Sequence, residues 1–558
     1  MNSAIVLAIG VGLMLCGYAF YSKFIASKIL GLDNSLPTPA HTMKDGVDYV
    51  PTNKYVLWGH HFTSVAGAAP IIGPAIAVIW GWVPAVIWVV FGTIFMAGVH
   101  DMSAIWASMR NRGQSIGSIA GTVMGTRVRS LMMVVIFLLL LMVNAVFGVA
   151  IANMLIKTPS AVLPVWGALV VAFIIGQCIY RYNMSLVWVS IIGVIALYGL
   201  IYLGPMFPVV LPETFLGLPD NAVWILILFA YAAVASLLPV WMLLQPRDYI
   251  NGLQLFVGLI LLYAAIFIST PNIVAPAINT DLPMSAPSIV PLLFVTIACG
   301  AISGFHGLVA TGTTSKQIDK EEDARFVGYF GALGEGMLAL GAILAATAGF
   351  ATLGDWQAVY QNFGDGSIGA FIDGGATILS NGVGIEMVLS QTMLTVMAAL
   401  FAGTTMDTGV RLQRYIFQEF GEFYNLPTLN KGWVATLLAV GTCLVLAFGA
   451  GGIDGAGGMI IWPLFGTTNQ LMAALTLMIV TVILLRNGKT VWYTLAPLCF
   501  LLVMTLFALL IQLKTFYDDG NWLLIVMDLV ILIASVLVTF ESFSVLRREW
   551  GKHKGKNV

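Results

Sequence analysis

The chain has 558 residues, of which 59% are hydrophobic and only 9% charged, and its mean hydropathy is +0.94. A soluble protein of this length needs far more surface charge, so the composition excludes that class and indicates a polytopic membrane protein. We therefore expect the lipid bilayer, and no nucleic acid, as a partner. The formal net charge of −1 says little about partners, and the sequence does not give the oligomeric state.

Apolar stretches of the length that crosses a bilayer recur along the whole chain. They predict an all-α fold of about 15 transmembrane helices. The first stretch has no preceding basic region and no A-x-A site, so we interpret it as a retained helix. The expected limits are 3–22, 56–80, 82–108, 131–152, 160–178, 184–203, 221–244, 253–270, 288–311, 326–350, 385–403, 433–450, 457–484, 491–513 and 522–543.

The basic residues predict the orientation. If the N-terminus lies outside, 23 of the 25 Lys and Arg residues fall in the inside segments, and only Lys157 and Lys514 fall outside. The positive-inside rule therefore predicts an outside N-terminus and a cytoplasmic C-terminus. The basic tail from Arg547 is expected at anionic headgroups. The two long outside loops, 204–220 and 351–384, are expected to be solvated connectors.

The second stretch is interrupted by "SVAGAAPIIGP" at residues 64–74, which holds prolines and glycines in the middle of an apolar run. Backbone groups freed from a helix in lipid must find partners or line a cavity. Secondary transporters carry such breaks in matched pairs, one in each half of an inverted repeat. Pro239 interrupts the seventh stretch, five spans later and in the opposite direction. We therefore predict a five-plus-five inverted repeat with two broken helices.

This repeat divides the chain into four expected segments. They are an N-terminal helix with a cytoplasmic loop (1–55), a first repeat (56–203), a second repeat (221–403) and peripheral helices with a basic tail (404–558).

The two breaks also predict a substrate site. A half-helix that begins at a proline presents N–H groups and the positive end of its dipole, which suit a carboxylate or another small anion. Ordinary proline kinks are the alternative. The expected substrate-binding residues are Gly67, Ala68, Ala69, Pro70, Ser236, Leu237 and Pro239.

Several long strings resemble the carbon-starvation protein A family. They include "YVLWGHHFTSVAGAAPIIGPAIAVIWGW", "HDMSAIWASMRNRGQSIGSIAG", "SLLPVWMLLQPRDYING" and "ISGFHGLVATGTTSKQID", and the resemblance extends from about residue 50 to 484. It implies an inner-membrane uptake carrier for pyruvate or peptides. It also implies the amino acid–polyamine–organocation superfamily, whose fold is a five-plus-five inverted repeat.

Ionisable residues inside apolar spans are costly and therefore candidates for function. A carboxyl group buried at Glu335 favours its protonated form unless it is paired, and histidine can relay protons near neutral pH. A structural pair or hydrogen bond between helices is the alternative for Glu335, and a polar cluster at the membrane interface is the alternative for His60, His61, His100 and Asp101. The proton-coupling candidates are Glu335, His306, His61 and Asp101.

Hydroxyl groups near the ninth span form a candidate cation site, consisting of Ser303, Thr311, Thr313 and Thr314. Their alternative role is to hydrogen-bond to the helix backbone. Asp407 and Arg411 are spaced i, i+4, so we expect them to form a structural salt bridge. The five cysteines form no C-x-x-C pair and are expected to pack, so we expect no structural metal site.

The sequence thus predicts a secondary active transporter that imports a small carboxylate or peptides. No G-x-x-x-x-G-K-[ST] is present, so a proton or sodium gradient is the expected energy source, with no other cofactor. We expect no enzymatic activity, and H-E-x-x-H is absent. A haem- or metal-binding redox protein and a channel remain alternatives.

Overall fold

The computed structural model describes residues 1–46, 48–239, 242–453 and 457–554, and it is mostly helical. Thirteen of the described helices are long and apolar enough to cross a membrane, and a bent helix pair raises the number to as many as fourteen. The predicted all-α polytopic fold is therefore confirmed. The expected span 288–311 consists of two short helices. Lys556 of the expected basic tail lies outside the described residues.

The helices of the first part of the chain lie close to the expected spans. They are α1 (Ser3–Cys16), η1 (Gly17–Ser22), η2 (Ile25–Leu30), α2 (Pro39–Thr42), α3 (Lys54–Ala66), α4 (Ala69–Ala77), η3 (Val78–Trp80), α5 (Trp82–Gly92), η4 (Thr93–Ala97), α6 (Gly98–Arg110), α7 (Ile116–Met124), α8 (Thr126–Lys157), η5 (Pro159–Ala161), α9 (Val162–Tyr180), α10 (Leu186–Leu203), η6 (Gly204–Met206) and α11 (Asp220–Leu237). A short hairpin of β1 (Thr214–Phe215) and β2 (Leu218–Pro219) precedes α11.

The second part of the chain continues in the same way. Its helices are α12 (Leu244–Ser269), α13 (Ile289–Thr296), α14 (Gly304–Gly312), η7 (Thr314–Lys316), η8 (Arg325–Phe330), α15 (Gly331–Ala348), α16 (Leu353–Val359), α17 (Ser367–Val383), α18 (Met387–Phe423), α19 (Gly432–Gly449), α20 (Gly457–Arg486), α21 (Trp492–Asp518) and α22 (Trp522–Lys554). The segment 351–384 is thus not a plain connector, because it contains α16 and α17, and α17 packs on α4, α12, α15 and α18.

The first predicted break is present. The helix axis bends by 46° between α3 and the segment Ala69–Trp80, which contains α4 and η3. Gly67 causes it, since its φ of +57° and ψ of −159° belong to a region that residues with a Cβ avoid. Pro70 is in the first turn of α4, where its missing N–H leaves no helical bond unmade.

The second break lies elsewhere than expected. Pro239 does not interrupt a span, because α11 ends at Leu237 and α12 begins at Leu244. The prediction was wrong because a proline between two helices and a proline within one look alike in sequence. We interpret α13–α14 as the second broken crossing, since these two short helices are separated by residues 297–303. Gly300 lies in that interruption with a φ of +95°.

The two broken crossings have matched neighbours. The half-helix α3 packs on α12, and the half-helix α14 packs on α20; α8 packs on α11, and α18 packs on α19. The helices α8 and α18 also pack extensively on each other. Spans two and nine are an odd number of crossings apart, as inverted halves require. In place of the expected 221–403, we propose a second half that begins with α13 at residue 289.

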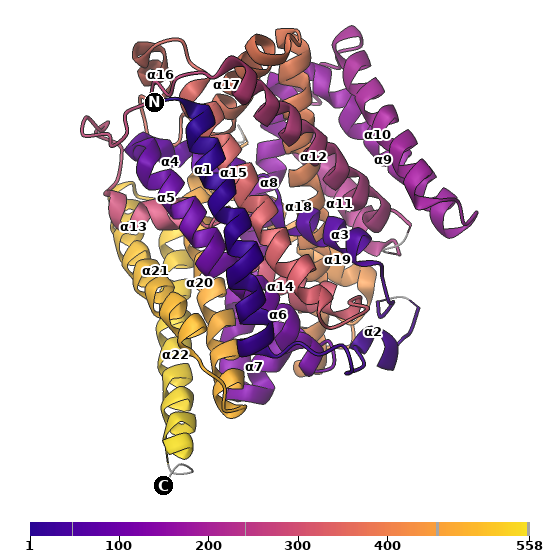
Figure 1. Cartoon of the computed structure of the whole chain (residues 1–558), viewed down its shortest axis with the longest axis vertical. Coiled ribbons are helices and arrows are strands. Elements are labelled where there is room, and N and C mark those ends of the chain that lie inside the picture. Colours follow the sequence, from indigo (N-terminus) through magenta and orange to yellow (C-terminus); the bar gives the residue numbers. More distant parts are fainter. Residues whose placement is uncertain (47, 240–241, 454–456, 555–558) are drawn as a thin grey trace.

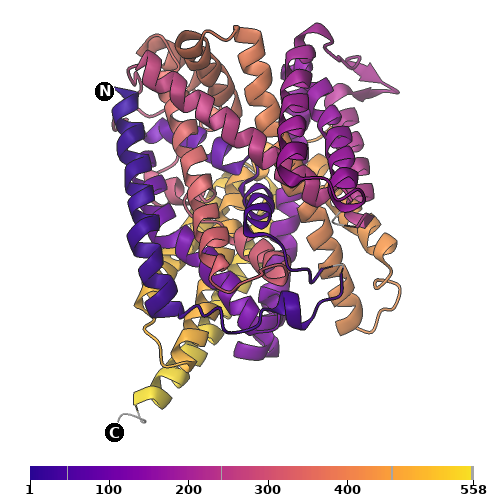
Figure 2. The same ribbon diagram turned by 45° about the vertical axis from the view of Figure 1, so that its right-hand side comes forward.

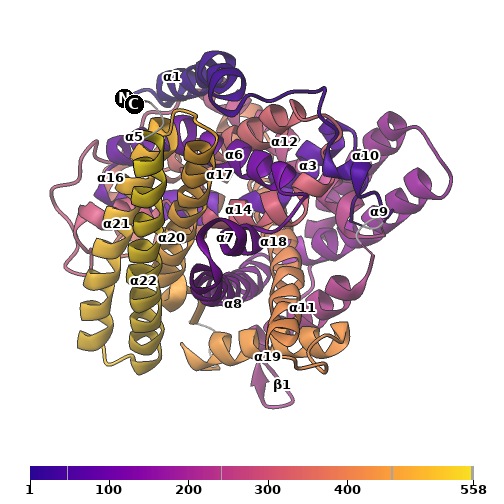
Figure 3. The same ribbon diagram turned by 90° about the horizontal axis from the view of Figure 1, so that it is seen from below.

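The two described ends of the chain lie at opposite ends of the long axis (Figure 1). The start of α1 is held against the loop after α12, where the Ser3 N–H donates to the Pro271 carbonyl at 3.1 Å. Figure 2 shows α1 and its continuation along the outside of the bundle. Seen from below, α21 and α22 lie at one edge and α9 and α10 at the opposite edge (Figure 3). The half-helices α3 and α14 lie between these groups (Figure 3).

Candidate functional site

Four helices bring the predicted coupling residues together. His61 lies on α3, Asp101 on α6, His306 on α14 and Glu335 on α15, and both α14 and α15 pack on α3 and on α6. All four side chains are fully buried. The sequence identified each residue separately, and the fold places them in one cluster, which we call the coupling cluster.

His306 is the centre of the coupling cluster. Its Nδ1 lies 2.7 Å from Asp101 Oδ2, and its Nε2 lies 3.1 Å from Glu335 Oε2. Asp101 also receives His100 Nδ1 at 2.8 Å on its other oxygen, and His61 Nε2 lies 3.9 Å away. Each carboxylate therefore faces at least one imidazole, which offsets the cost of burying its charge.

The coupling cluster contains buried polar atoms that have no hydrogen-bond partner among the described residues. They are Nε2 of His61 and His306 and both carboxyl oxygens of Glu335, and Nε2 of the neighbouring His100 is also without a partner. A buried polar atom without a partner is expensive, so in a native protein it calls for an explanation such as strain, a catalytic role or a bound water or ion. These atoms make the coupling cluster a candidate site for a proton.

Glycines allow the helices of the cluster to approach closely. A Cβ on Gly331, in α15, would stand 3.1 Å from His61 Cδ2. A Cβ on Gly307, in α14, would stand 3.3 Å from His100 Cε1. Gly331 lies in the pattern "FGALGEG", four residues before Glu335, and Gly307 lies in "FHGLVATG", directly after His306.

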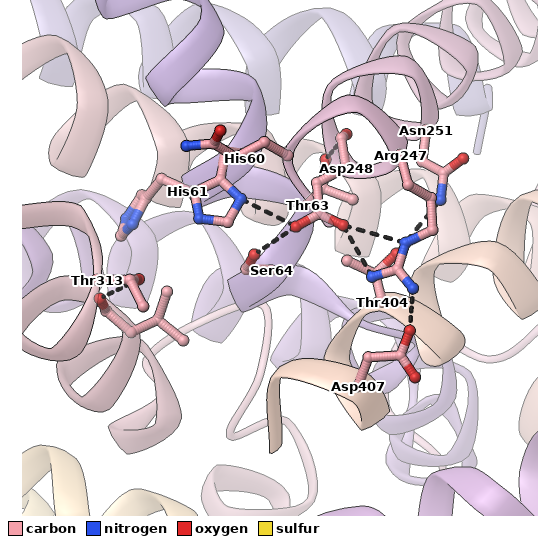
Figure 4. A network of polar contacts seen from close by, with 12 residues as sticks. His60, His61, Thr63, Ser64, Arg247, Asp248, Asn251, Thr313, Thr404 and Asp407 are labelled. Atoms are coloured by element: carbon pink, nitrogen blue, oxygen red, sulfur yellow. Dashed lines mark hydrogen bonds and ion pairs between the residues drawn. The ribbon is translucent and has the colours of Figure 1, made fainter. Parts of the chain in front are cut away.

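A second buried network lies on the other side of α3, and the sequence did not identify it (Figure 4). His60 Nδ1 lies 2.9 Å from Asp248 Oδ2, while His61 points away from this network. Arg247 Nη2 donates to Asp248 Oδ1 at 2.9 Å, and its Nη1 donates to Asp407 Oδ2. The sequence did not single out Arg247 because it falls between the expected spans 221–244 and 253–270. In the structure it lies in the first turn of α12 and is buried.

The predicted salt bridge between Asp407 and Arg411 is wrong. Asp407 pairs with Arg247 instead. Arg411 donates to the carbonyl oxygens of Ala235 and Leu238, at 3.1 and 2.5 Å, where α11 ends. The terminal carbonyls of a helix carry partial negative charge and lack partners within the helix, so they compete for the guanidinium.

No hydrogen bond joins the Gly67–Pro70 part of the predicted substrate site to its Ser236–Pro239 part among the described residues. The Ser236 hydroxyl lies 3.3 Å from the Thr436 hydroxyl of α19, and the side chains of Leu237 and Pro239 are exposed. The break at Gly67–Pro70 instead meets the break in α13–α14, since a Cβ on Gly300 would lie 3.6 Å from Pro70 Cβ. The two broken crossings thus touch, but the second is not the one expected.

The four hydroxyls of the predicted cation site turn to separate partners. The Ser303 hydroxyl donates to Asn469 Oδ1 at 3.2 Å, and the Thr314 hydroxyl lies 2.9 Å from His61 Nδ1. Thr311 and Thr313 donate to backbone carbonyls one turn earlier in α14. Within the described ranges, no group of three His, Cys, Asp or Glu side chains could hold a metal ion.

Comparisons with known proteins give a consistent result. The family described as carbon starvation protein CstA matches residues 2–359 and 351–508. The "Peptide transporter CstA" of Campylobacter jejuni subsp. jejuni serotype O:2 is 32% identical over 93% of this chain and 81% of that protein. The "Pyruvate/proton symporter BtsT" of Escherichia coli K12 is 31% identical over 89% and 80%.

Among solved structures, a mutant manganese transporter from Eremococcus coleocola aligns with a TM-score of 0.51. The alignment covers 91% of this chain and 99% of that chain, at 14% sequence identity. At this identity the likeness shows the fold alone.

Proposed function

The chain belongs to the carbon starvation protein CstA family, and on that premise we propose that it is a proton-coupled secondary active transporter. Its substrate would be a small carboxylate such as pyruvate, or a peptide. The names of two relatives, a peptide transporter and a pyruvate/proton symporter, support this choice. No enzymatic step is part of the proposal, and the proton is the only coupling species that it requires.

One observation carries the proposal. His306 is fully buried on the broken crossing α13–α14 and stands between two carboxylates, Asp101 and Glu335. Three ionisable groups are costly in the middle of a helix bundle, and such groups in membrane proteins mark ion or proton paths. These groups lie beside the broken crossing α13–α14. A proton would therefore bind next to a helix that can move during transport.

The chemistry follows from the ring nitrogens of His306. When Nδ1 donates to Asp101, a neutral ring leaves Nε2 as a bare acceptor facing Glu335 Oε2 at 3.1 Å. One further proton, on Nε2 or on Glu335, turns this contact from repulsive to attractive. Loading and releasing that proton therefore changes the force between α14 and α15, which is what coupling requires.

The experiment is uptake of labelled pyruvate or dialanine into proteoliposomes, under a proton gradient and separately under a sodium gradient. We expect accumulation with the proton gradient alone. Glu335→Gln and His306→Ala should abolish that accumulation while retaining exchange of substrate across the membrane. Accumulation that needs sodium and ignores pH would contradict the proton assignment.

We further propose that the chain lies in the inner (plasma) membrane with its N-terminus outside and its C-terminus in the cytoplasm. The distribution of Lys and Arg supports this orientation, as do the opposite positions of the two ends (Figure 1). Reporter fusions at residues near each end test it. Two fusions reporting the same side would contradict both the orientation and the odd number of crossings.

A further inference from the structure

The buried network around Arg247 has no role in the proton path described above. Arg247 is only 2% exposed, and all three of its guanidinium nitrogens donate hydrogen bonds. Its two carboxylate partners are Asp248, the next residue on α12, and Asp407 on α18. A fully buried guanidinium suits planar recognition of a carboxylate, because its donors match the two oxygens.

The two carboxylates are held very differently. Both oxygens of Asp248 are occupied, Oδ1 by Arg247 and Oδ2 by His60 and the Ser64 hydroxyl at 2.9 and 3.1 Å. Asp407 uses only Oδ2, and its Oδ1 is buried with no hydrogen-bond partner among the described residues. Asp248 is therefore the permanent partner of Arg247, and Asp407 is the one that can exchange.

A cavity reaches Arg247, one member of this ion pair. Arg247, Tyr231 and Thr404 line it together with apolar residues of α8, α9, α11 and α18, and its volume is about 30 Å³. That volume has room for water but not for pyruvate. Gly403 also lines it, and a Cβ there would meet no heavy atom within 4 Å. A ligand larger than water would therefore need further space beside the guanidinium.

We propose that Arg247 binds the carboxylate of the substrate and that Asp407 occupies this place as an internal counter-ion until it takes up a proton. The inference rests on the proposed transport of a carboxylate-bearing substrate. Asp407 gains one proton at Oδ1, and the hydrogen bond from Arg247 Nη1 to Asp407 breaks. Arg247 Nη1 then donates a hydrogen bond to the substrate carboxylate. One anion and one proton enter together, so the charge of the site does not change.

The other charged and titratable groups near Asp407 are few. From α12 it faces Arg247 and, behind it, Asp248; from α11 it faces the Tyr231 hydroxyl, which donates to Oδ2 at 2.7 Å. From α3, His60 acts through Asp248. On α18 itself, Arg411 is one turn away and bonded to backbone carbonyls. The helices α9 and α19 carry no Asp, Glu, His, Lys or Arg, and α8 carries charges only at its ends.

Binding of labelled pyruvate, and separately of dialanine, to the full-length protein tests the exchange as a function of pH. Because one proton would bind with each carboxylate, the Kd should rise by about tenfold per pH unit once Asp407 is ionised. Asp407→Asn imitates the protonated residue, so its Kd should be independent of pH. Asp528→Asn, which alters a buried carboxyl on α22, should retain the pH dependence of the unaltered protein.

Loss of the guanidinium gives the second arm. Arg247→Gln removes the charged donors and should weaken binding by about a hundredfold. Arg411→Gln, which alters a buried arginine bonded to carbonyls, should change Kd by less than about threefold. Thermal unfolding of each variant establishes that it is folded.

A third variant gives a reading that does not depend on Arg247. In Gly403→Leu, the added side chain would fill the cavity and abolish binding. Gly441→Leu is the matched control, because a Cβ at Gly441 also meets no heavy atom within 4 Å but Gly441 does not line the cavity. We therefore expect Gly441→Leu to bind normally.

Three results would overturn the inference: normal affinity in Arg247→Gln, normal affinity in Gly403→Leu, or an unaltered pH dependence in Asp407→Asn. If Arg247→Gln fails to fold, the other two variants decide. Failure of the proposed function looks different, because the unaltered protein would then bind neither pyruvate nor dialanine.

Discussion

His306 Nε2 and Glu335 Oε2 lie 3.1 Å apart in the interior of the bundle, yet the contact is not an aligned hydrogen bond. Both carboxyl oxygens of Glu335 lack a hydrogen-bond partner among the residues that the structure describes. The two atoms are therefore at ion-pair distance without an aligned hydrogen bond between them. A single proton decides whether the contact attracts or repels, which makes the pair sensitive to protonation.

The first prediction is that Glu335→Gln separates transport from coupling. Glutamine has the same size but cannot take up or release a proton, so exchange of substrate should persist while accumulation driven by a proton gradient is lost. Parallel counterflow and gradient-driven uptake in proteoliposomes measure the two activities. Asp528→Asn is the matched control, since Asp528 is a buried carboxyl outside the coupling cluster. Normal accumulation in Glu335→Gln would remove Glu335 from the proton path.

The second prediction concerns the stability of the coupling cluster. Asp101 receives His100 Nδ1 and His306 Nδ1 at 2.8 and 2.7 Å. Asp101→Asn removes the charge that faces both rings, and breaking a buried pair costs on the order of 3–5 kcal/mol. We expect a clearly lower unfolding temperature in detergent. Asp373→Asn, at an exposed position of α17, should leave that temperature nearly unchanged.

The ionisable residues of the coupling cluster could be predicted from sequence because so few charged residues occur within the apolar spans. Their meeting could not be predicted, because His61, Asp101, His306 and Glu335 lie on four different helices. Arg247 was missed for a related reason: a basic residue close to the end of an apolar stretch looks like a loop residue. Only the packing of α12 against α3 shows that it is buried.

The breaks show the same limit. The first could be predicted because Gly67 and Pro70 interrupt a long apolar run. The second contains no proline: residues 297–303 depend on Gly300, whose positive φ a sequence does not reveal. The sequence pattern "ACGAISGFHG" carries three glycines, which was the available signal. The sequence pattern favoured Pro239 as the second break, although Pro239 lies between two separate helices.

The third prediction tests the backbone at the first break. Gly67 has a φ of +57°, and a Cβ there would stand 2.7 Å from the Thr405 hydroxyl and 3.0 Å from the Phe147 ring. Gly67→Ala therefore combines backbone strain with a steric clash, and strain of this kind costs about 1–3 kcal/mol. We expect a lower unfolding temperature. Gly441→Ala, in a helical position with no neighbour within 4 Å, should not lower it.

The last prediction concerns the start of α14, the half-helix that carries His306. Asn469 Oδ1 accepts the Phe305 N–H at 2.8 Å and the Ser303 hydroxyl at 3.2 Å, so this α20 side chain satisfies the helix end. The substituted leucine in Asn469→Leu has a similar volume but leaves the Phe305 N–H buried without an acceptor, which costs about 1–3 kcal/mol.

The adjacent Gln470 provides the control. It is also buried, but neither of its amide atoms has a partner among the described residues. Gln470→Leu should therefore be neutral or stabilising, because it removes polar groups that make no hydrogen bond. Thermal unfolding of the two variants measures the difference. Equal effects of both substitutions would show that Asn469 does not hold the start of α14.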